Sequence, residues 1–232
     1  MIRRDYILRM IEELRRVLAG IVALKQGRRW QEVEGTLDEQ FKRFVGAGAE
    51  EAVEFSDTEL SARLMQGEAT QFVHDKTLFL ITLFKEAGDA AVAQDHPDEG
   101  RAFHLKGLHL LLGVLGGEEP SERPDFVPAV AVFTAALAEA PLPAQTQAML
   151  MHHHERTGAF AKAEDALFAL LDAAPDTGEV VQFGIAFYER LRGQSDAALA
   201  AGNLPRSELE AGVAELHRRK EVLALRKHSR PG

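Results

Sequence analysis

The sequence predicts an all-α protein of about ten helices, paired as helical hairpins and stacked in an α-solenoid. Three observations support this fold class. Apolar residues recur at helical spacing in almost every segment of the 232-residue chain. No segment shows sustained strand alternation bounded by hairpin turns. One apolar pattern also recurs three times along the chain at nearly regular intervals.

The first predicted helix spans residues 2–26 and carries one apolar stripe, formed by Ile2, Tyr6, Met10, Leu14, Val17, Leu18, Ile21 and Leu24. Gly27 ends it, and Trp30 begins a second helix with Val33, Leu37, Phe41 and Phe44 turned inward. Residues 46–56 are loop-like. Ser56 and Glu59 then form a capping box for a short helix that ends near Gln66.

A long helix is expected from about Thr70 to Gln94, and another from Pro97 to about Leu115. Proline suits the first turn because its missing N–H costs nothing there. Residues 116–125, GGEEPSERPD, form the clearest linker in the chain, with two glycines, two prolines and five charged residues. They separate an N-terminal half (1–115) from a C-terminal half (126–232), within what we expect to be one continuous helical array.

The C-terminal half begins with a predicted helix over 126–140, closed by Pro141 and Pro143. Two antiparallel helices joined by Gly158 follow in 144–175, the second with Ala163, Ala166, Leu167, Leu170, Leu171 and Ala174 on one face. Asp176 and Glu179 are expected to cap a long helix from Glu179 to Ala201, which Gly202 and Asn203 stop. Ser207 and Glu210 form a capping box for a last helix that buries Leu209, Val213, Leu216 and Leu223.

An internal repeat favours stacked hairpins over the alternative, an irregular helical bundle. Trp30, Val33, Leu37 and Phe41 share their spacing with Phe160, Ala163, Leu167 and Leu171, and also with Pro97, Gly100, His104 and Leu108. The three starts are separated by 67 and 63 residues, each close to twice a period of roughly 34 residues.

The hairpin at 144–175 resembles a tetratricopeptide repeat through Gly158, Phe160, Ala163, Leu167, Leu170, Leu171 and Pro175. This resemblance implies a solenoid that binds proteins rather than transforming substrates. The Trp-Leu-Gly-Tyr positions of the family's first helix hold Gln147, Leu150, Met151 and His154, of which only Leu150 fits. The groove-lining positions would be Gln145, Ala148, Met149, His152, Glu155 and Arg156. They include no Lys or Asn, which argues against a carboxylate-clamp ligand.

Two further segments carry a second resemblance. The opening MIRRDYILRMIEEL and the segment 201–212, AGNLPRSELEAG, are similar to an uncharacterised bacterial family, a domain of unknown function with helical, repeat-like members. The family implies a fold and a bacterial cytoplasmic protein, and it implies no chemistry.

Composition excludes several classes of function. The chain has no cysteine, so disulfides, thiolate metal sites and cysteine nucleophiles are excluded. A net charge of −9 disfavours nucleic acid, and we interpret the basic stretch 218–230 as a solvated helix face. No apolar run approaches the ~20 residues that span a bilayer. The N-terminus lacks a signal-peptide pattern, so we expect a cytoplasmic protein without membrane association.

The tract His152–His154 raises a metal hypothesis. Consecutive helical residues point about 100° apart, so only pairs such as His152 with Glu155, or His217 with Glu221, can converge. Two ligands are too few for a helical metal site, and we expect an exposed polar face without metal or cofactor. Trp30 is expected to anchor the first two helices.

The missing nucleotide-binding, metalloprotease and hydrolase motifs argue against an enzyme. The hypothesis is therefore a non-enzymatic interaction scaffold that binds a protein or peptide, or a second copy of itself, through Gln145, Met149, His152, Glu155 and Arg156. Two alternatives stay open: a small-molecule sensor or enzyme with a pocket between the two halves, and nucleic-acid binding through the basic C-terminus.

Overall fold

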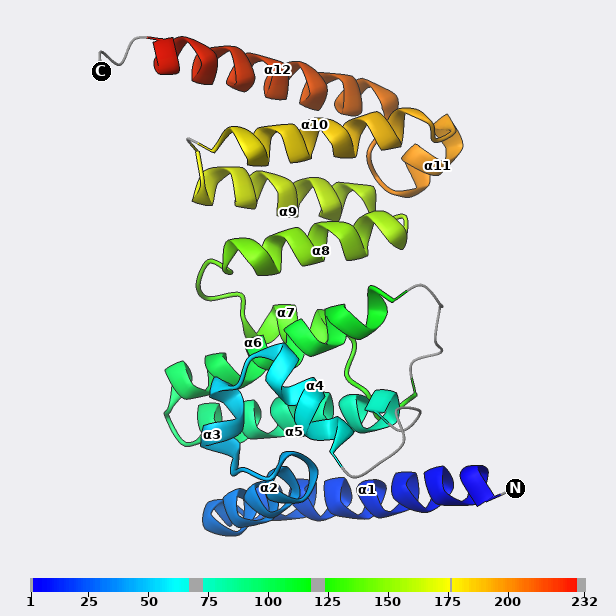
Figure 1. The fold of residues 1–232 in the computed structure, drawn as a ribbon, viewed down its shortest axis with the longest axis vertical. Helices are drawn as coiled ribbons and strands as arrows, with labels where there is room; N and C mark the ends of the chain where they lie inside the picture. Colours follow the sequence, from blue (N-terminus) through cyan, green and yellow to red (C-terminus); the bar gives the residue numbers. More distant parts are fainter. Residues whose placement is uncertain (1, 67–72, 118–123, 176, 229–232) are drawn as a thin grey trace. The chain divides into compact units, whose positions relative to one another are not determined.

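The computed structural model of the protein describes residues 2–66, 73–117, 124–175 and 177–228 (Figure 1). These ranges contain twelve α-helices and no strand, which confirms the predicted all-α class. The helices form two compact units, Met1–Pro141 and Leu142–Gly232. Two helices beyond the ten expected are the short elements α3 (Ala49–Glu54) and α11 (Asp196–Ala201).

The first unit is built around α5 (Val73–Ala93), which contacts α1 (Ile2–Gln26), α2 (Trp30–Val45), α3, α4 (Asp57–Met65) and α6 (Pro97–Leu115). Every residue from 78 to 84 is buried, as expected of a helix that is covered on all sides. Phe84 of α5 packs against Phe41 of α2 and Phe103 of α6, with ring centroids 4.8 Å and 6.3 Å apart. Aromatic packing therefore ties three helices into one core.

Most of the first unit follows the predicted pattern. Val33, Leu37 and Phe41 are buried, and the Ser56 side chain accepts the backbone N–H of Glu59 at 3.1 Å. Trp30 is only half-buried. The side chains of Ile2, Tyr6 and Met10, and the predicted helix start at Thr70, lie outside the described residues.

Two predictions in the first unit are wrong. Residues 46–56 are not a loop, because α3 forms where Asp38 of α2 accepts the N–H of Ala49 at 3.0 Å. The helix predicted over 126–140 is only α7 (Val130–Ala136). Arg101 of α6 donates hydrogen bonds to the backbone carbonyls that follow the end of α7. The acceptors are Leu137 and Ala140, both at 3.3 Å, and Pro141 at 2.7 Å. These carbonyls are therefore satisfied without a longer helix.

The predicted linker lies between α6 and α7, and its residues 118–123 are outside the described part of the chain. α7 packs against α6 and belongs to the first unit. The chain divides into the two compact units between Pro141 and Leu142.

The second unit consists of α8 (Ala144–Arg156), α9 (Phe160–Ala173), α10 (Gly178–Arg192), α11 and α12 (Arg206–His228). Within it, α8, α9, α10 and α12 run side by side as successive rows (Figure 1). The predicted inner face of α9 is confirmed for Ala163, Ala166, Leu167, Leu170 and Leu171, which are buried, whereas Ala174 follows the end of the helix and is half-buried. Tyr188 of α10 is also fully buried and donates its hydroxyl to Glu164 of α9.

Two predictions in the second unit are wrong. The helix expected over 179–201 breaks at 193–195, because Ser195 caps α11 by accepting the N–H of Ala198 at 3.2 Å. Arg206 satisfies the carbonyls exposed by this break, at Arg192 (3.1 Å) and Gln194 (2.6 Å). The capping box at Ser207 is absent, since α12 begins at Arg206 and Glu210 instead binds Arg192. Asp176 lies outside the described residues.

Each of the three segments of the internal repeat begins a helix, and each of these helices follows a turn of the same geometry. α2, α6 and α9 start at Trp30, Pro97 and Phe160, the first residues of the three segments. In each turn one residue has a positive φ: Arg28 (53°), Asp95 (67°) and Gly158 (73°). In each turn the next amide binds the carbonyl five residues earlier, as in a Schellman motif: Arg29 to Leu24 (3.0 Å), His96 to Ala91 (2.9 Å) and Ala159 to His154 (2.9 Å). The sequence repeat therefore corresponds to a repeated helix–turn–helix hairpin.

This shared turn makes a stability prediction. Asp95 adopts the left-handed conformation that costs an L-residue about 1 kcal/mol and glycine nothing. We expect Asp95→Gly to raise the free energy of unfolding by up to about 1 kcal/mol, and Gly158→Ala to lower it by about the same amount. Denaturant unfolding of both variants measures this. Equal signs for the two changes would contradict the shared geometry.

Candidate functional site

The predicted site residues all lie on α8, where the neighbouring α10 engages two of them. Glu155 accepts two hydrogen bonds from Arg190 of α10, at 2.6 and 2.8 Å, and its side chain is only 15% exposed. The His152 ring packs edge-on against Phe183 of α10, with centroids 5.3 Å apart. Gln145 and Arg156 are exposed and Met149 is half-buried. The structure thus pairs Glu155 with α10, while His152 contacts Phe183 through its ring and stays exposed, as do Gln145 and Arg156.

The histidine tract has no metal geometry. Among the residues that the structure describes, no three or more His, Asp or Glu side chains are placed to hold a metal ion. Burial lowers the pKa of His154 to about 4 and also lowers the pKa of His153. His217 and Glu221 on α12 are both exposed. The lowered pKa values keep His153 and His154 mainly neutral at neutral pH.

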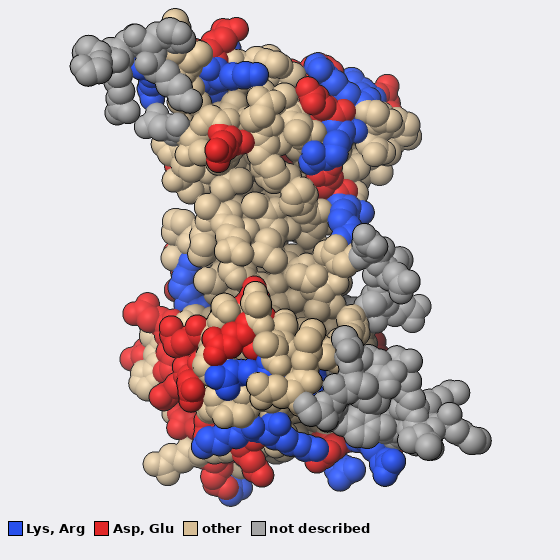
Figure 2. All heavy atoms as spheres, in the orientation of Figure 1, with Lys and Arg blue, Asp and Glu red and all other residues tan. Residues whose placement is uncertain are grey.

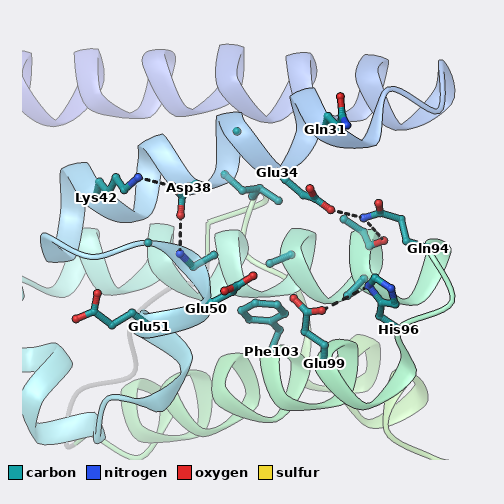
Figure 3. A pocket seen from close by; sticks show the side chains of 17 residues that line it. Gln31, Glu34, Asp38, Lys42, Glu50, Glu51, Gln94, His96, Glu99 and Phe103 are labelled. Atoms are coloured by element: carbon teal, nitrogen blue, oxygen red, sulfur yellow. Dashed lines mark hydrogen bonds and ion pairs between the residues drawn. The ribbon is translucent and has the colours of Figure 1, made fainter.

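The structure reveals a groove in the first unit that the sequence analysis did not predict. It lies among α2, α3, α5 and α6 and has a volume of about 740 Å³ (Figure 3). Its lining comes from four segments of the chain that span residues 31–42, 48–51, 87–94 and 96–103. Only folding of α5 against these neighbours brings them together.

The floor of the groove is apolar and made mostly of small residues. Ala87, Ala90 and Ala91 of α5 line it together with Leu37 of α2 and Phe103 of α6. All five are at least 95% buried. Alanines at these positions leave room above α5 where larger side chains would fill the space. The groove can therefore take apolar side chains from a ligand.

The rim of the groove is acidic. Five carboxylates line it, and Lys42 is the single lining ammonium, so the lining has a formal charge of −4 with His96 neutral; the carboxylates are Glu34, Asp38, Glu50, Glu51 and Glu99. Glu50 and Glu51 are exposed and have no ion pair within the described ranges. Figure 2 shows red carboxylates gathered over the face of the first unit that carries α3. The rim thus retains negative charge for a cationic ligand.

Asp38 holds one wall of the groove in place. Its carboxylate binds Lys42 on its own helix and the Ala49 N–H at the start of α3 (Figure 3). The hydrogen bond from Lys42 lowers the pKa of Asp38, and the Ala49 amide adds to this effect against partial burial. A Cβ at Gly48 would collide with the same carboxylate, so glycine is needed there. Asp38 therefore fixes the position from which α3 presents Glu50 and Glu51.

At the other end of the groove, Gln94 links α5 to α2. Its side-chain amide donates to Glu34 at 2.8 Å and to the carbonyl of Ala90 at 3.3 Å. His96 lies 3.6 Å from the Glu99 carboxylate, one turn into α6. Both ends of the groove are therefore held by polar contacts.

A second polar cluster lies on the side of α5 that faces α1 and α6. Lys25 of α1 binds Glu86 (2.9 Å) and Asp89 (3.0 Å), and Lys85 binds the same two carboxylates, both at 2.9 Å. The Nε2–H of His104 donates to Asp89 at 3.2 Å. Burial raises the pKa of Asp89, but hydrogen bonds from His104, Lys85 and Lys25 outweigh it and hold the pKa well below its usual range.

This cluster is structural rather than open to a ligand. His104 is 3% exposed, and its Nδ1 is buried without a hydrogen-bond partner among the described residues. Gly88 allows the approach, since a Cβ there would lie 2.5 Å from the His104 ring. The cluster fastens α1, α5 and α6 together and so supports the groove, whose floor is the opposite side of α5.

The sequence contained a partial signal for the groove. Acidic residues are dense in 32–54, and small residues recur at 87, 90, 91 and 93 on a helix that is otherwise apolar. Because residues 46–56 are predicted to be loop-like, the sequence does not predict where the carboxylates of Glu50 and Glu51 lie. No helix in the described ranges is long and apolar enough to cross a membrane.

Comparison with known proteins gives one match. The model of a family described as "Family of unknown function (DUF6483)" matches residues 1–221, which cover the first compact unit and the second as far as residue 221. No curated protein and no solved structure matches the chain.

Proposed function

The chain belongs to this family of unknown function, DUF6483, and we propose that it is a non-enzymatic interaction module whose groove binds a cationic, amphipathic segment of a protein partner. Membership in an uncharacterised family was predicted from the two ends of the chain and is confirmed. The observation that carries the proposal is an apolar floor of five buried side chains beneath a rim with a formal charge of −4.

Floor and rim contribute in different ways. Burying one ligand Leu or Val side chain on the floor is worth about 1.5–3 kcal/mol. Each exposed ion pair at the rim adds only about 0–1 kcal/mol, but the summed negative potential speeds encounter with a basic segment. We therefore assign affinity chiefly to the floor and selection of charge to the rim. A basic helix with one apolar face satisfies both.

The repeated hairpins fit this function. We propose that α1–α2, α5–α6 and α8–α9 are tetratricopeptide-like repeats, a class that presents binding grooves on stacked hairpins. The support is the common turn at residues 28, 95 and 158 and the buried positions that follow it. The groove lies on the α5–α6 hairpin and its α2 neighbour, whereas the sequence predicts binding residues on α8.

The test is titration of the full-length protein into a fluorescent synthetic helix with leucines on one face and lysines on the other. We expect Glu50→Gln/Glu51→Gln to weaken binding roughly tenfold at low ionic strength, and the difference to shrink as salt screens the charges. The matched control is Glu39→Gln/Glu54→Gln, which neutralises exposed carboxylates of the same elements, α2 and α3, outside the groove lining. Fluorescence anisotropy measures both.

Three outcomes contradict the proposal. The first is equal weakening by the control pair, which would indicate nonspecific attraction to an acidic surface. The second is equal affinity for the same peptide with glutamate in place of lysine. The third is full competition by a small polyamine, because that would favour the small-molecule alternative: the groove volume falls in the range of such sites.

A further inference from the structure

The end of α12 has an exposed apolar face. The first half of this helix packs on the second unit through Leu209, Val213 and Leu216, which are all buried. Between residues 217 and 226, only Arg219 and Leu223 are half-buried. Val222 is 48% exposed and Leu225 68% exposed. Because these two residues are three apart, they lie together on one face of the helix.

Cations surround this apolar pair. Residues 217–228 contain Arg218, Arg219, Lys220, Arg226 and Lys227 and one acid, Glu221, a formal charge of +4. Arg218 lies one turn before Val222, and Arg226 one turn after it, on the same helix face. Arg219 lies three residues before Val222, and Glu215 pairs with both Arg218 and Arg219, with Arg219 at 3.0 Å. The exposed face is therefore apolar at its centre and basic at both ends.

This face complements the acidic groove in both charge and polarity. The groove lining has a formal charge of −4 around an apolar floor, and the α12 segment has +4 around an apolar pair. We infer that the groove of one copy binds residues 217–228 of α12 of a second copy, so that the protein self-associates. This inference rests on the proposed function, because it names the cationic segment that the groove takes.

Such an association joins two different surfaces. Two copies that exchange their α12 ends form a closed dimer, and copies that do not close add further subunits. In both cases the average mass rises with protein concentration. High salt lowers it, since the rim charges are exposed and therefore screened.

The experiment is sedimentation equilibrium of the full-length protein over a range of concentrations at low and high ionic strength. We expect the wild type to self-associate at low ionic strength. Leu225→Asp should weaken self-association at least about tenfold, the loss expected for one central anchoring side chain. Arg226→Glu should weaken it as well. Lys220→Glu, the same charge change on the opposite side of α12, is the matched control and should change it much less.

A charge exchange makes the test specific. Glu50→Lys/Glu51→Lys reverses the groove, and Arg218→Glu/Arg226→Glu reverses the helix end. Each double variant alone should be monomeric, whereas a mixture of the two, or all four changes in one chain, should recover association. Circular dichroism of every variant establishes that it is folded, and recovery by the fourfold variant cannot arise from unfolding.

The results separate this inference from the proposed function. A monomeric wild type that still binds the synthetic cationic helix would overturn self-association and leave the groove as a site for another protein. Self-association that survives both charge reversals would overturn the α12–groove contact. Loss of both peptide binding and self-association in the groove variant, with the helix-end variant still binding peptide, supports both.

Discussion

Asp89→Asn is expected to lower the free energy of unfolding by about 2 kcal/mol at neutral pH. Removing one partner of a buried ion pair costs roughly 3–5 kcal/mol, and the Asp89 side chain, at 32% exposed, is partly screened by water. The substitution leaves Lys25 and Lys85 with Glu86 alone as counter-charge. Denaturant unfolding at constant ionic strength measures the loss.

The effect has a defined pH dependence. The pKa of Asp89 is lower in the folded protein than in the unfolded chain, so its stabilising contribution is fully present above the unfolded pKa of about 3.9. It is lost as the pH falls below about 4 toward the folded pKa. The difference between wild type and Asp89→Asn should therefore be constant from pH 5 upward and shrink in more acidic solution.

Asp172→Asn provides the control. Asp172 pairs with Arg219 at 3.8 Å with 76% of its side chain exposed, so its removal should change stability by less than about 0.5 kcal/mol at any pH. If both substitutions changed stability equally, the ion pairs and hydrogen bond of Asp89 would not hold α1, α5 and α6 together.

Local sequence signals predicted most of the helices because their causes are local. Gly158 ends α8 through its positive φ, Pro97 starts α6, and the apolar stripe of α9 faces the core as expected. The predicted helix boundaries are wrong where a side chain from another part of the sequence binds a backbone N–H or C=O group at a helix end. Asp38 caps α3, Arg101 satisfies the end of α7, and Arg206 stabilises the break before α11. Sequence periodicity contains no information about such long-range partners.

The groove could not be predicted for the same reason. Its lining residues are spread over about seventy positions, and its carboxylates depend on α3, which forms through the Asp38–Ala49 contact. The α8 residues, by contrast, were chosen by family register alone. That register does not show that Arg190 pairs with Glu155 or that Phe183 packs edge-on against the exposed ring of His152.

The α5–α6 hairpin has a glycine at the position where the first helix of the tetratricopeptide pattern has a small residue. In the α8–α9 hairpin this position is occupied by Met151, twelve residues before Ala163. In the α5–α6 hairpin the equivalent position, twelve residues before Gly100, is Gly88. A Cβ on Gly100 would lie 2.5 Å from Val92 Cγ2 and 3.0 Å from the carbonyl of Gly88. Two glycines therefore let the backbones of α5 and α6 approach closely. The corresponding position of the second unit holds the larger, fully buried side chain of Met151.

Gly88→Ala is therefore expected to destabilise the protein although alanine is the better helix former. The new methyl group would lie 2.5 Å from Cδ2 and Nε2 of His104, whose ring is buried and bonded to Asp89. Overpacking of this kind costs about 1–3 kcal/mol, which exceeds the gain of roughly 1 kcal/mol in helix propensity. We expect a net loss of up to about 2 kcal/mol, and a smaller loss when Asp89 is already Asn, because the two sites share His104.

Gly113→Ala on α6 is the matched change, since no atom lies within 4 Å of the added methyl group there. It should raise stability by up to about 1 kcal/mol through helix propensity alone. Thermal and denaturant unfolding of both variants, with the Gly88→Ala/Asp89→Asn double variant completing the cycle, measures the coupling. Additive losses would show that the two sites are not coupled through His104, and then the contact of Gly88 with His104 would be independent of the Asp89 ion pairs.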